Sequence, residues 1–134
     1  MTAPEAVQLA QLALRILLAG LFAFMGVTHF VPKVRRGMQA MIPPALRRRG
    51  IPSPALLVAF TGAAELAGAA GLLAPWPLLR EITGISLVVF LILVFPANAY
   101  ASQHPERFGR AAIPFWPRCL GQLALIALVL AAVS

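Results

Sequence analysis

Long apolar runs dominate the chain and recur four times, with polar or proline-rich segments between them. A membrane-spanning helix needs about 20 consecutive, mainly apolar residues. We therefore predict four spans, at about residues 7–28, 54–73, 81–100 and 118–133. The predicted fold class is all-α: a polytopic membrane four-helix bundle, with residues 1–134 forming a single membrane domain.

Prolines stand at the predicted boundaries of these spans. Proline fixes φ and lacks a backbone donor, so it favours the first turn of a helix or a break between helices. Proline-rich turns lie before the second span, after it and before the fourth span. The fourth span is short, so we expect it either to begin nearer Pro114 or to thin the bilayer locally.

The loop between the first two spans is long, from about residue 30 to residue 53. Val34, Met38 and Met41 fall on one helical stripe, and Arg35 and Arg36 project away from it. That pattern is typical of a short helix that lies in the membrane interface. An irregular basic loop is the alternative interpretation.

The composition agrees with a membrane protein. The 134 residues are 60% hydrophobic and 11% charged, whereas soluble domains are roughly 45–50% apolar. The net charge is +7, but the basic residues flank the apolar spans. We therefore expect them to set topology and to meet anionic lipid. The expected partner is the lipid bilayer, and nucleic acid is not expected.

The basic residues also predict an orientation. Most of them lie in the first and third loops, which the positive-inside rule places in the cytoplasm. Both termini would then face outward, and we expect a bacterial inner membrane. The basic residues of these loops are Lys33, Arg35, Arg36, Arg47, Arg48, Arg49, Arg107, Arg110 and Arg118.

Glu65 is the only charged residue between Pro54 and Leu79. A carboxylate at the centre of a span costs roughly 2.5–3.5 kcal/mol on insertion scales, and such residues are usually paired in the bundle or functional. Arg15 and Glu65 would lie at similar depths, roughly 12–15 Å from the outer surface. We predict that they form a buried salt bridge, which either fixes helix register or serves a ligand or a proton.

Small residues surround Glu65 in the second span. Gly62, Gly68 and Gly71 let helix backbones approach closely, so we expect a role in helix packing. The alternative is that the missing side chains leave a cleft beside Glu65.

A second polar group is predicted at the opposite end of the bundle. His29 ends the first span, Asn98 and Tyr100 end the third, and Pro96 interrupts the third. His29 would bind a metal, move a proton or hydrogen-bond a quinone, or it is simply an interfacial hydrogen-bonding residue. With Cys119 as the single cysteine and no Asp, we expect no metal site and assign no catalytic residue.

Several local patterns, in this order, resemble the DoxX-like family of small four-span integral membrane proteins. They are Leu14-Arg15-Ile16-Leu17, Gly26-Val27-Thr28-His29-Phe30, Met41-Ile42-Pro43, Thr61-Gly62-Ala63-Ala64-Glu65 with Gly68, and Phe95-Pro96-Ala97-Asn98. The resemblance implies a four-helix membrane fold and accessory roles in redox or stress physiology. It brings no established catalytic residue.

Three functions remain open. The first is binding of a hydrophobic small molecule, a quinone or a lipid, or service as an accessory membrane subunit of a redox enzyme. The second is a quinone-linked oxidoreductase subunit, which would need a partner or a bound cofactor. The third is a small-solute transporter, which would need a homo-oligomer because four short spans leave little room for a pore.

Overall fold

The computed structural model describes residues 1–46, 53–108 and 113–134 of the chain. Over these ranges the chain is helical and contains no strand, which confirms the all-α fold class. The elements are α1 (Ala3–Thr28), α2 (Pro32–Ala40), the short 3-10 helix η1 (Pro44–Leu46), α3 (Pro54–Leu72), α4 (Pro77–Ser102), α5 (Pro105–Phe108) and α6 (Phe115–Val133).

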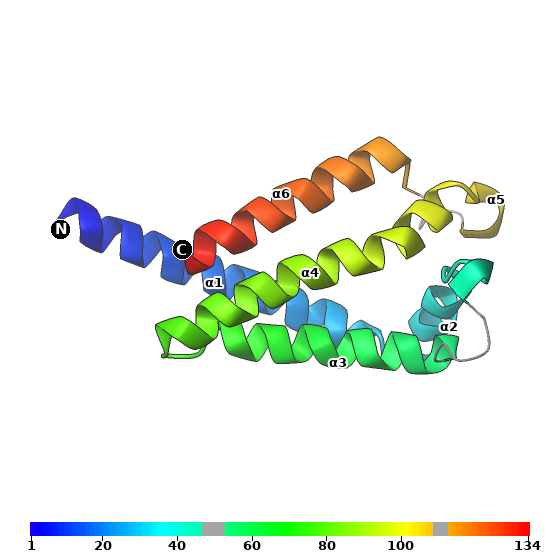
Figure 1. Cartoon of the computed structure of the whole chain (residues 1–134), viewed down its shortest axis with the longest axis horizontal. Coiled ribbons are helices and arrows are strands. Elements are labelled where there is room, and N and C mark those ends of the chain that lie inside the picture. Colours follow the sequence, from blue (N-terminus) through cyan, green and yellow to red (C-terminus); the bar gives the residue numbers. More distant parts are fainter. Residues whose placement is uncertain (47–52, 109–112) are drawn as a thin grey trace.

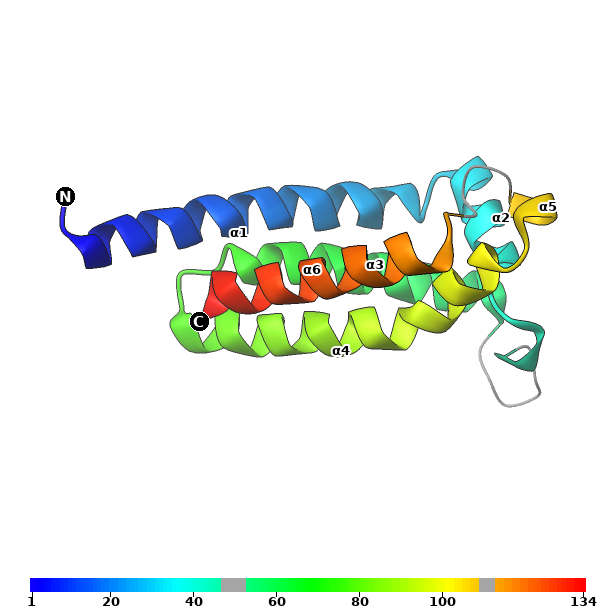
Figure 2. The ribbon, with the colours of Figure 1, turned by 90° about the horizontal axis from the view of Figure 1, so that it is seen from above.

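Four of these helices, α1, α3, α4 and α6, are long and apolar enough to cross a membrane. They run side by side as a bundle in which α1 packs against α3 and α6, and α4 packs against the same two helices. Both termini and the α3–α4 turn lie at one end, which we call the terminal end. Helices α2 and α5 lie at the other end, the α2 end (Figures 1 and 2).

Three of the long helices begin earlier than the predicted spans, and for α6 a start near Pro114 was one of the two alternatives expected from the sequence. Proline occupies the first or second position of α1 and α4, and α6 begins directly after Pro114. At the start of α1, Thr2 and Glu5 form a reciprocal capping box. The prolines are therefore part of the first helical turns, as their fixed φ favours.

The predicted short helix of the first loop is present as α2, which packs against α3. Met38 within α2 and Met41 at its C-cap are half-buried, but Val34 is 39% exposed. The rest of the protein therefore covers two of the three stripe residues in part and leaves Val34 exposed. Arg47, Arg48, Arg49 and Arg110, which entered the orientation argument, lie outside the described residues.

The hydrophobic core lies in the half of the bundle near the terminal end, and all four long helices contribute to it. Glycines make this close packing possible: a Cβ on Gly68 would lie 2.5 Å from Leu87 Cδ2, and a Cβ on Gly71 would collide with Thr83. The core residues are Leu18, Ala19, Phe22, Ala69, Leu72, Leu87, Leu91, Val129 and Ala132.

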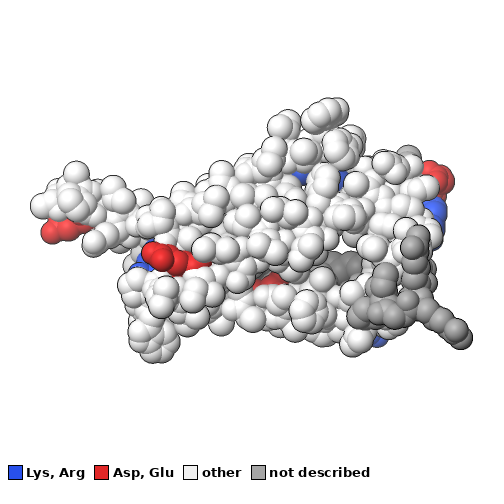
Figure 3. Space-filling model, viewed as in Figure 1, with Lys and Arg blue, Asp and Glu red and all other residues white. Residues whose placement is uncertain are grey.

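The surface of the bundle is almost free of charge on the face drawn in Figure 3, where white atoms cover most of its length. Many large apolar side chains of the long helices are exposed, including Leu17, Phe24, Phe60 and Leu93. Exposed apolar surface on this scale is typical of helices that face lipid.

Candidate functional site

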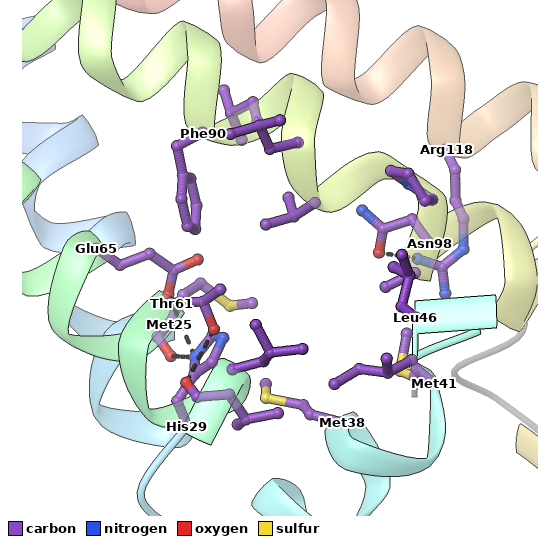
Figure 4. Close-up of a pocket in the computed structure, with 18 of the residues that line it drawn as sticks. Met25, His29, Met38, Met41, Leu46, Thr61, Glu65, Phe90, Asn98 and Arg118 are labelled. Atoms are coloured by element: carbon purple, nitrogen blue, oxygen red, sulfur yellow. Dashed lines mark hydrogen bonds and ion pairs between the residues drawn. The ribbon is translucent and has the colours of Figure 1, made fainter. Parts of the chain in front are cut away.

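A cavity of about 530 Å³ lies in the half of the bundle near the α2 end. Side chains of α1, α2, η1, α3, α4 and α6 line it, and most of them are aliphatic, aromatic or methionine side chains. Polar lining side chains gather at two places (Figure 4). Glu65, His29 and Thr61 lie at one end of the cavity, and Asn98 and Arg118 lie at the other.

Glu65 and His29 form a buried acid–base pair at the first end. His29 Nδ1 lies 3.3 Å from Glu65 Oε2, and the two side chains are only 10% and 11% exposed. The same Nδ1 lies 2.6 Å from the Met25 carbonyl oxygen. Because a carbonyl oxygen can only accept, Nδ1 must carry a hydrogen, and its N–H donates a hydrogen bond to the Met25 carbonyl oxygen.

The carboxylate of Glu65 is left without a hydrogen bond at one oxygen. Its Oε2 is buried and has no hydrogen-bond partner among the described residues, although His29 Nδ1 is close. The single Nδ1–H points to the Met25 carbonyl oxygen. His29 therefore lies close to Glu65 but does not donate a hydrogen bond to it. A buried polar atom in this condition costs roughly 1–3 kcal/mol and calls for an explanation.

Glycines bring His29 and Glu65 together. A Cβ on Gly62 would lie 2.7 Å from the Cβ of His29 and 3.1 Å from the Gly26 carbonyl oxygen. The two glycines therefore let the end of α1 approach α3 closely, one turn of α3 before Glu65. Gly62 contributes to the site as well as to helix packing.

The predicted salt bridge between Arg15 and Glu65 was wrong. Among the described residues, the ion pairs within 4 Å are His29 with Glu65 and His104 with Glu106. Arg15 Nη1 instead donates to the Ala132 carbonyl oxygen at 3.0 Å, near the C-terminal end of α6. The buried pair that the sequence predicted does exist at Glu65, but its partner is a histidine.

The register of α1 against α3 explains the error. Gly26 faces Gly62, and the two helices run in opposite directions. Moving eleven residues back from Gly26 to Arg15 therefore corresponds to moving eleven residues forward from Gly62 to Leu73, at the end of α3. Because α1 has 26 residues and α3 has 19, the first turns of α1 project past the bundle. Counting residues from the helix ends therefore placed Arg15 and Glu65 at the same depth in the bundle, although they lie at different levels.

The second polar end is a hydrogen-bonded pair. Arg118 Nη1 donates to Asn98 Oδ1 at 2.8 Å, and Arg118 Nε donates to the Ile113 carbonyl oxygen at 3.1 Å. The sequence argument treated Arg118 only as a topological charge, whereas it lines the cavity. Pro96, two residues before Asn98 on α4, also lines it.

Tyr100 lies outside the cavity lining. Its hydroxyl accepts a hydrogen bond from Arg107 Nη1 at 2.8 Å, and its ring lies 4.4 Å from that of His104. The structure therefore brings together Glu65, His29 and Asn98, and separates them from Arg15 and Tyr100. The residues that sequence reasoning missed are Thr61, Phe90 and the donor role of Arg118; for Met38 and Met41 the helical stripe was a visible signal.

A family profile described as "Domain of unknown function (DUF8561)" matches residues 18–133. The chain belongs to this family. No curated protein and no solved structure matches the chain. The DUF8561 match includes His29, Glu65, Asn98 and Arg118, and thus both polar ends of the cavity, whereas Arg15 precedes it.

Proposed function

We propose that this chain is an integral membrane protein that binds a hydrophobic small molecule, a quinone or a lipid, in the cavity near the α2 end. The observation that carries the proposal is a mostly apolar cavity of about 530 Å³ with a few polar groups at its two ends. Cavities of roughly 300–1,000 Å³ with this kind of lining are typical of small-molecule sites.

The surrounding chemistry supports a ligand over a purely structural role. The cavity is partly open to its surroundings, and the side chains that line it make fewer packing contacts than side chains in a close-packed interior. Glu65 adds a second cost, because its Oε2 is buried without a donor among the described residues. A bound molecule would offset both costs.

The family resemblance and the charge distribution extend the proposal. The resemblance to DoxX-like proteins favours an accessory membrane subunit of a redox system, with a redox enzyme as partner. Lys33, Arg35, Arg36 and Arg107 lie at the α2 end. The positive-inside rule then puts the cavity in the cytoplasmic half of a bacterial inner membrane and both termini outside.

The test is binding by the purified chain in lipid nanodiscs, with a matched pair of variants on α3. Leu57 lines the cavity, whereas its neighbour Leu56 is 59% exposed on the outside of the helix. Native mass spectrometry of the wild-type protein should show a bound quinone or lipid. Leu57→Trp should lower its occupancy by projecting a larger ring into the cavity, and Leu56→Trp should retain it. Equal occupancy in both variants would contradict the proposal.

A further inference from the structure

At the Glu65 end of the cavity, the polar groups offer hydrogen-bond acceptors. The Thr61 hydroxyl donates its only proton to the Val58 carbonyl oxygen at 2.8 Å, which leaves oxygen lone pairs. The His29 Nδ1–H is committed to the Met25 carbonyl oxygen, so a neutral ring presents Nε2 as an acceptor. Glu65 Oε2, as a carboxylate oxygen, also accepts.

The other end of the cavity has the opposite character. Arg118 carries only donors, and Asn98 Oδ1 already accepts from it. Figure 4 shows these two side chains across the cavity from Glu65, and most of the other lining side chains are apolar, among them Phe90 on the side of Glu65 and Leu46 beside Asn98. The cavity therefore has an acceptor end, an apolar middle and a donor end.

We infer that the cavity selects ligands that carry a hydrogen-bond donor, an O–H or an N–H, at the end that reaches Glu65. This inference rests on the proposed function, because it names the ligand class of the same cavity. A donor satisfies Glu65 Oε2, which has no hydrogen bond among the described residues. A ligand with only acceptors at that end leaves the oxygen unsatisfied and adds lone-pair repulsion.

The discrimination should be large. A site whose buried polar group needs a ligand donor rejects a near-isosteric analogue that lacks it, because the group is then left desolvated and unpaired. Loss of one such hydrogen bond lowers affinity by about tenfold or more. For a quinone-type ligand, the same logic favours the hydroquinone, which carries O–H groups, over the oxidised quinone, which carries only acceptors.

Three probes with one nonyl chain test the inference, by calorimetric titration into loaded nanodiscs with empty nanodiscs subtracted. 4-Nonylphenol carries an O–H, 4-nonylbenzylamine carries an ammonium N–H, and 1-fluoro-4-nonylbenzene replaces the hydroxyl by a fluorine of similar size. The phenol should bind at least about tenfold more tightly than the fluoro compound. The amine offers an N–H donor together with a positive charge. Its affinity relative to the phenol therefore shows how much charge pairing with the carboxylate adds to the hydrogen bond.

Two variants connect the preference to one side chain. Glu65→Gln keeps the shape and adds an N–H₂ donor, so the ratio of phenol to fluoro affinity should fall several-fold. Glu81 lies outside the cavity lining at the exposed start of α4, so Glu81→Gln should leave the ratio unchanged. The wild-type comparison does not depend on whether either variant folds.

The outcomes separate the two claims. Binding of phenol and fluoro probes with equal affinity overturns donor selection and leaves the proposed function standing. Absence of binding by all three probes overturns the proposed function, and donor selection with it. A preference for the phenol that persists undiminished in Glu65→Gln would refute the assignment to Glu65.

Discussion

The two halves of the bundle are built differently, although the same four long helices run through both. In the half near the terminal end, Leu72 and Val129 are fully buried, and the spaces above Gly71 and Gly84 are filled by Thr83 and Val133. In the half near the α2 end, the same helices surround a cavity of about 530 Å³ that contains a buried carboxylate.

The difference teaches how a small membrane bundle can keep a hollow site. Lipid gives helices no hydrophobic reason to associate, so stability comes from close packing and hydrogen bonds. The packed half supplies these contacts, including the bond from Arg15 to the carbonyl of Ala132. The half near the α2 end can therefore keep a cavity and a buried carboxylate, which a close-packed apolar core would not accommodate.

The largest expected effect comes from truncating equivalent residues in the two halves. Leu72→Ala should lower the free energy of unfolding by about 2–5 kcal/mol, because a fully buried leucine leaves a new cavity. Leu57→Ala, on the same helix, removes a side chain that already faces a cavity, so its cost should be below about 1 kcal/mol. Unfolding in mixed micelles with rising sodium dodecyl sulfate measures both. Equal losses would remove the distinction between the halves.

Adding a methyl group sharpens the same comparison. At Gly71 a Cβ would collide with Thr83, so Gly71→Ala should destabilise the bundle by about 1–3 kcal/mol. At Gly20 nothing lies within 4 Å of the added Cβ. Gly20→Ala should therefore be neutral or stabilising by up to about 1 kcal/mol, because alanine is the better helix former. The same unfolding assay gives both values. If both variants lowered the free energy of unfolding, or both raised it, the close packing at Gly71 and the open space at Gly20 would be contradicted.

Substitution of a buried residue usually lowers the free energy of unfolding, but removal of the Glu65 carboxylate should raise it. Glu65→Leu should raise the free energy of unfolding of the ligand-free protein by about 1–2 kcal/mol, since it removes an unsatisfied buried oxygen. His29 is not left without a partner, because its Nδ1 keeps the hydrogen bond to the Met25 carbonyl oxygen. A salt bridge to Arg15 would have made the same change strongly destabilising. A loss of stability in Glu65→Leu, measured with Glu81→Leu as control, would show that the contact with His29 stabilises the Glu65 carboxylate even without an aligned hydrogen bond.

Much of the bundle could be predicted from the sequence, because apolar runs of membrane length and flanking prolines are local signals. The four membrane-length helices, the short helix α2 and the burial of Glu65 inside the bundle all follow from such signals. The presence of a polar partner close to the buried Glu65 also followed from the cost of an isolated charge, although that partner is His29 and not Arg15.

The partner of Glu65 could not be predicted, because it depends on helix register. The contact between Gly26 and Gly62 sets that register, and nothing local to Arg15 or His29 reveals it. Arg118 was missed for a related reason: a basic residue at the start of a span serves topology equally well whether or not it faces a cavity.

The smallest effect is expected at the second histidine–glutamate pair, which serves as a control for the first. His104 Nδ1 lies 3.1 Å from Glu106 Oε1, close to the 3.3 Å of the buried pair, but these side chains are 34% and 65% exposed. Exposed pairs contribute little because water already solvates both groups. Glu106→Gln should therefore leave the unfolding midpoint near that of the wild type at neutral pH.

The pH dependence gives this control a definite sign. A hydrogen bond from its own backbone N–H, and then one with His104, hold the pKa of the Glu106 carboxyl below its usual value. A lowered folded-state pKa gives a stabilisation that is present above the ordinary glutamate pKa and is lost as pH falls through the folded value. The wild type and Glu106→Gln should thus differ slightly at neutral pH and coincide in acid. A midpoint shift as large as that of Gly71→Ala would mean that geometry, and not burial, decides what a histidine–glutamate pair contributes, and the contrast with Glu65 would fail.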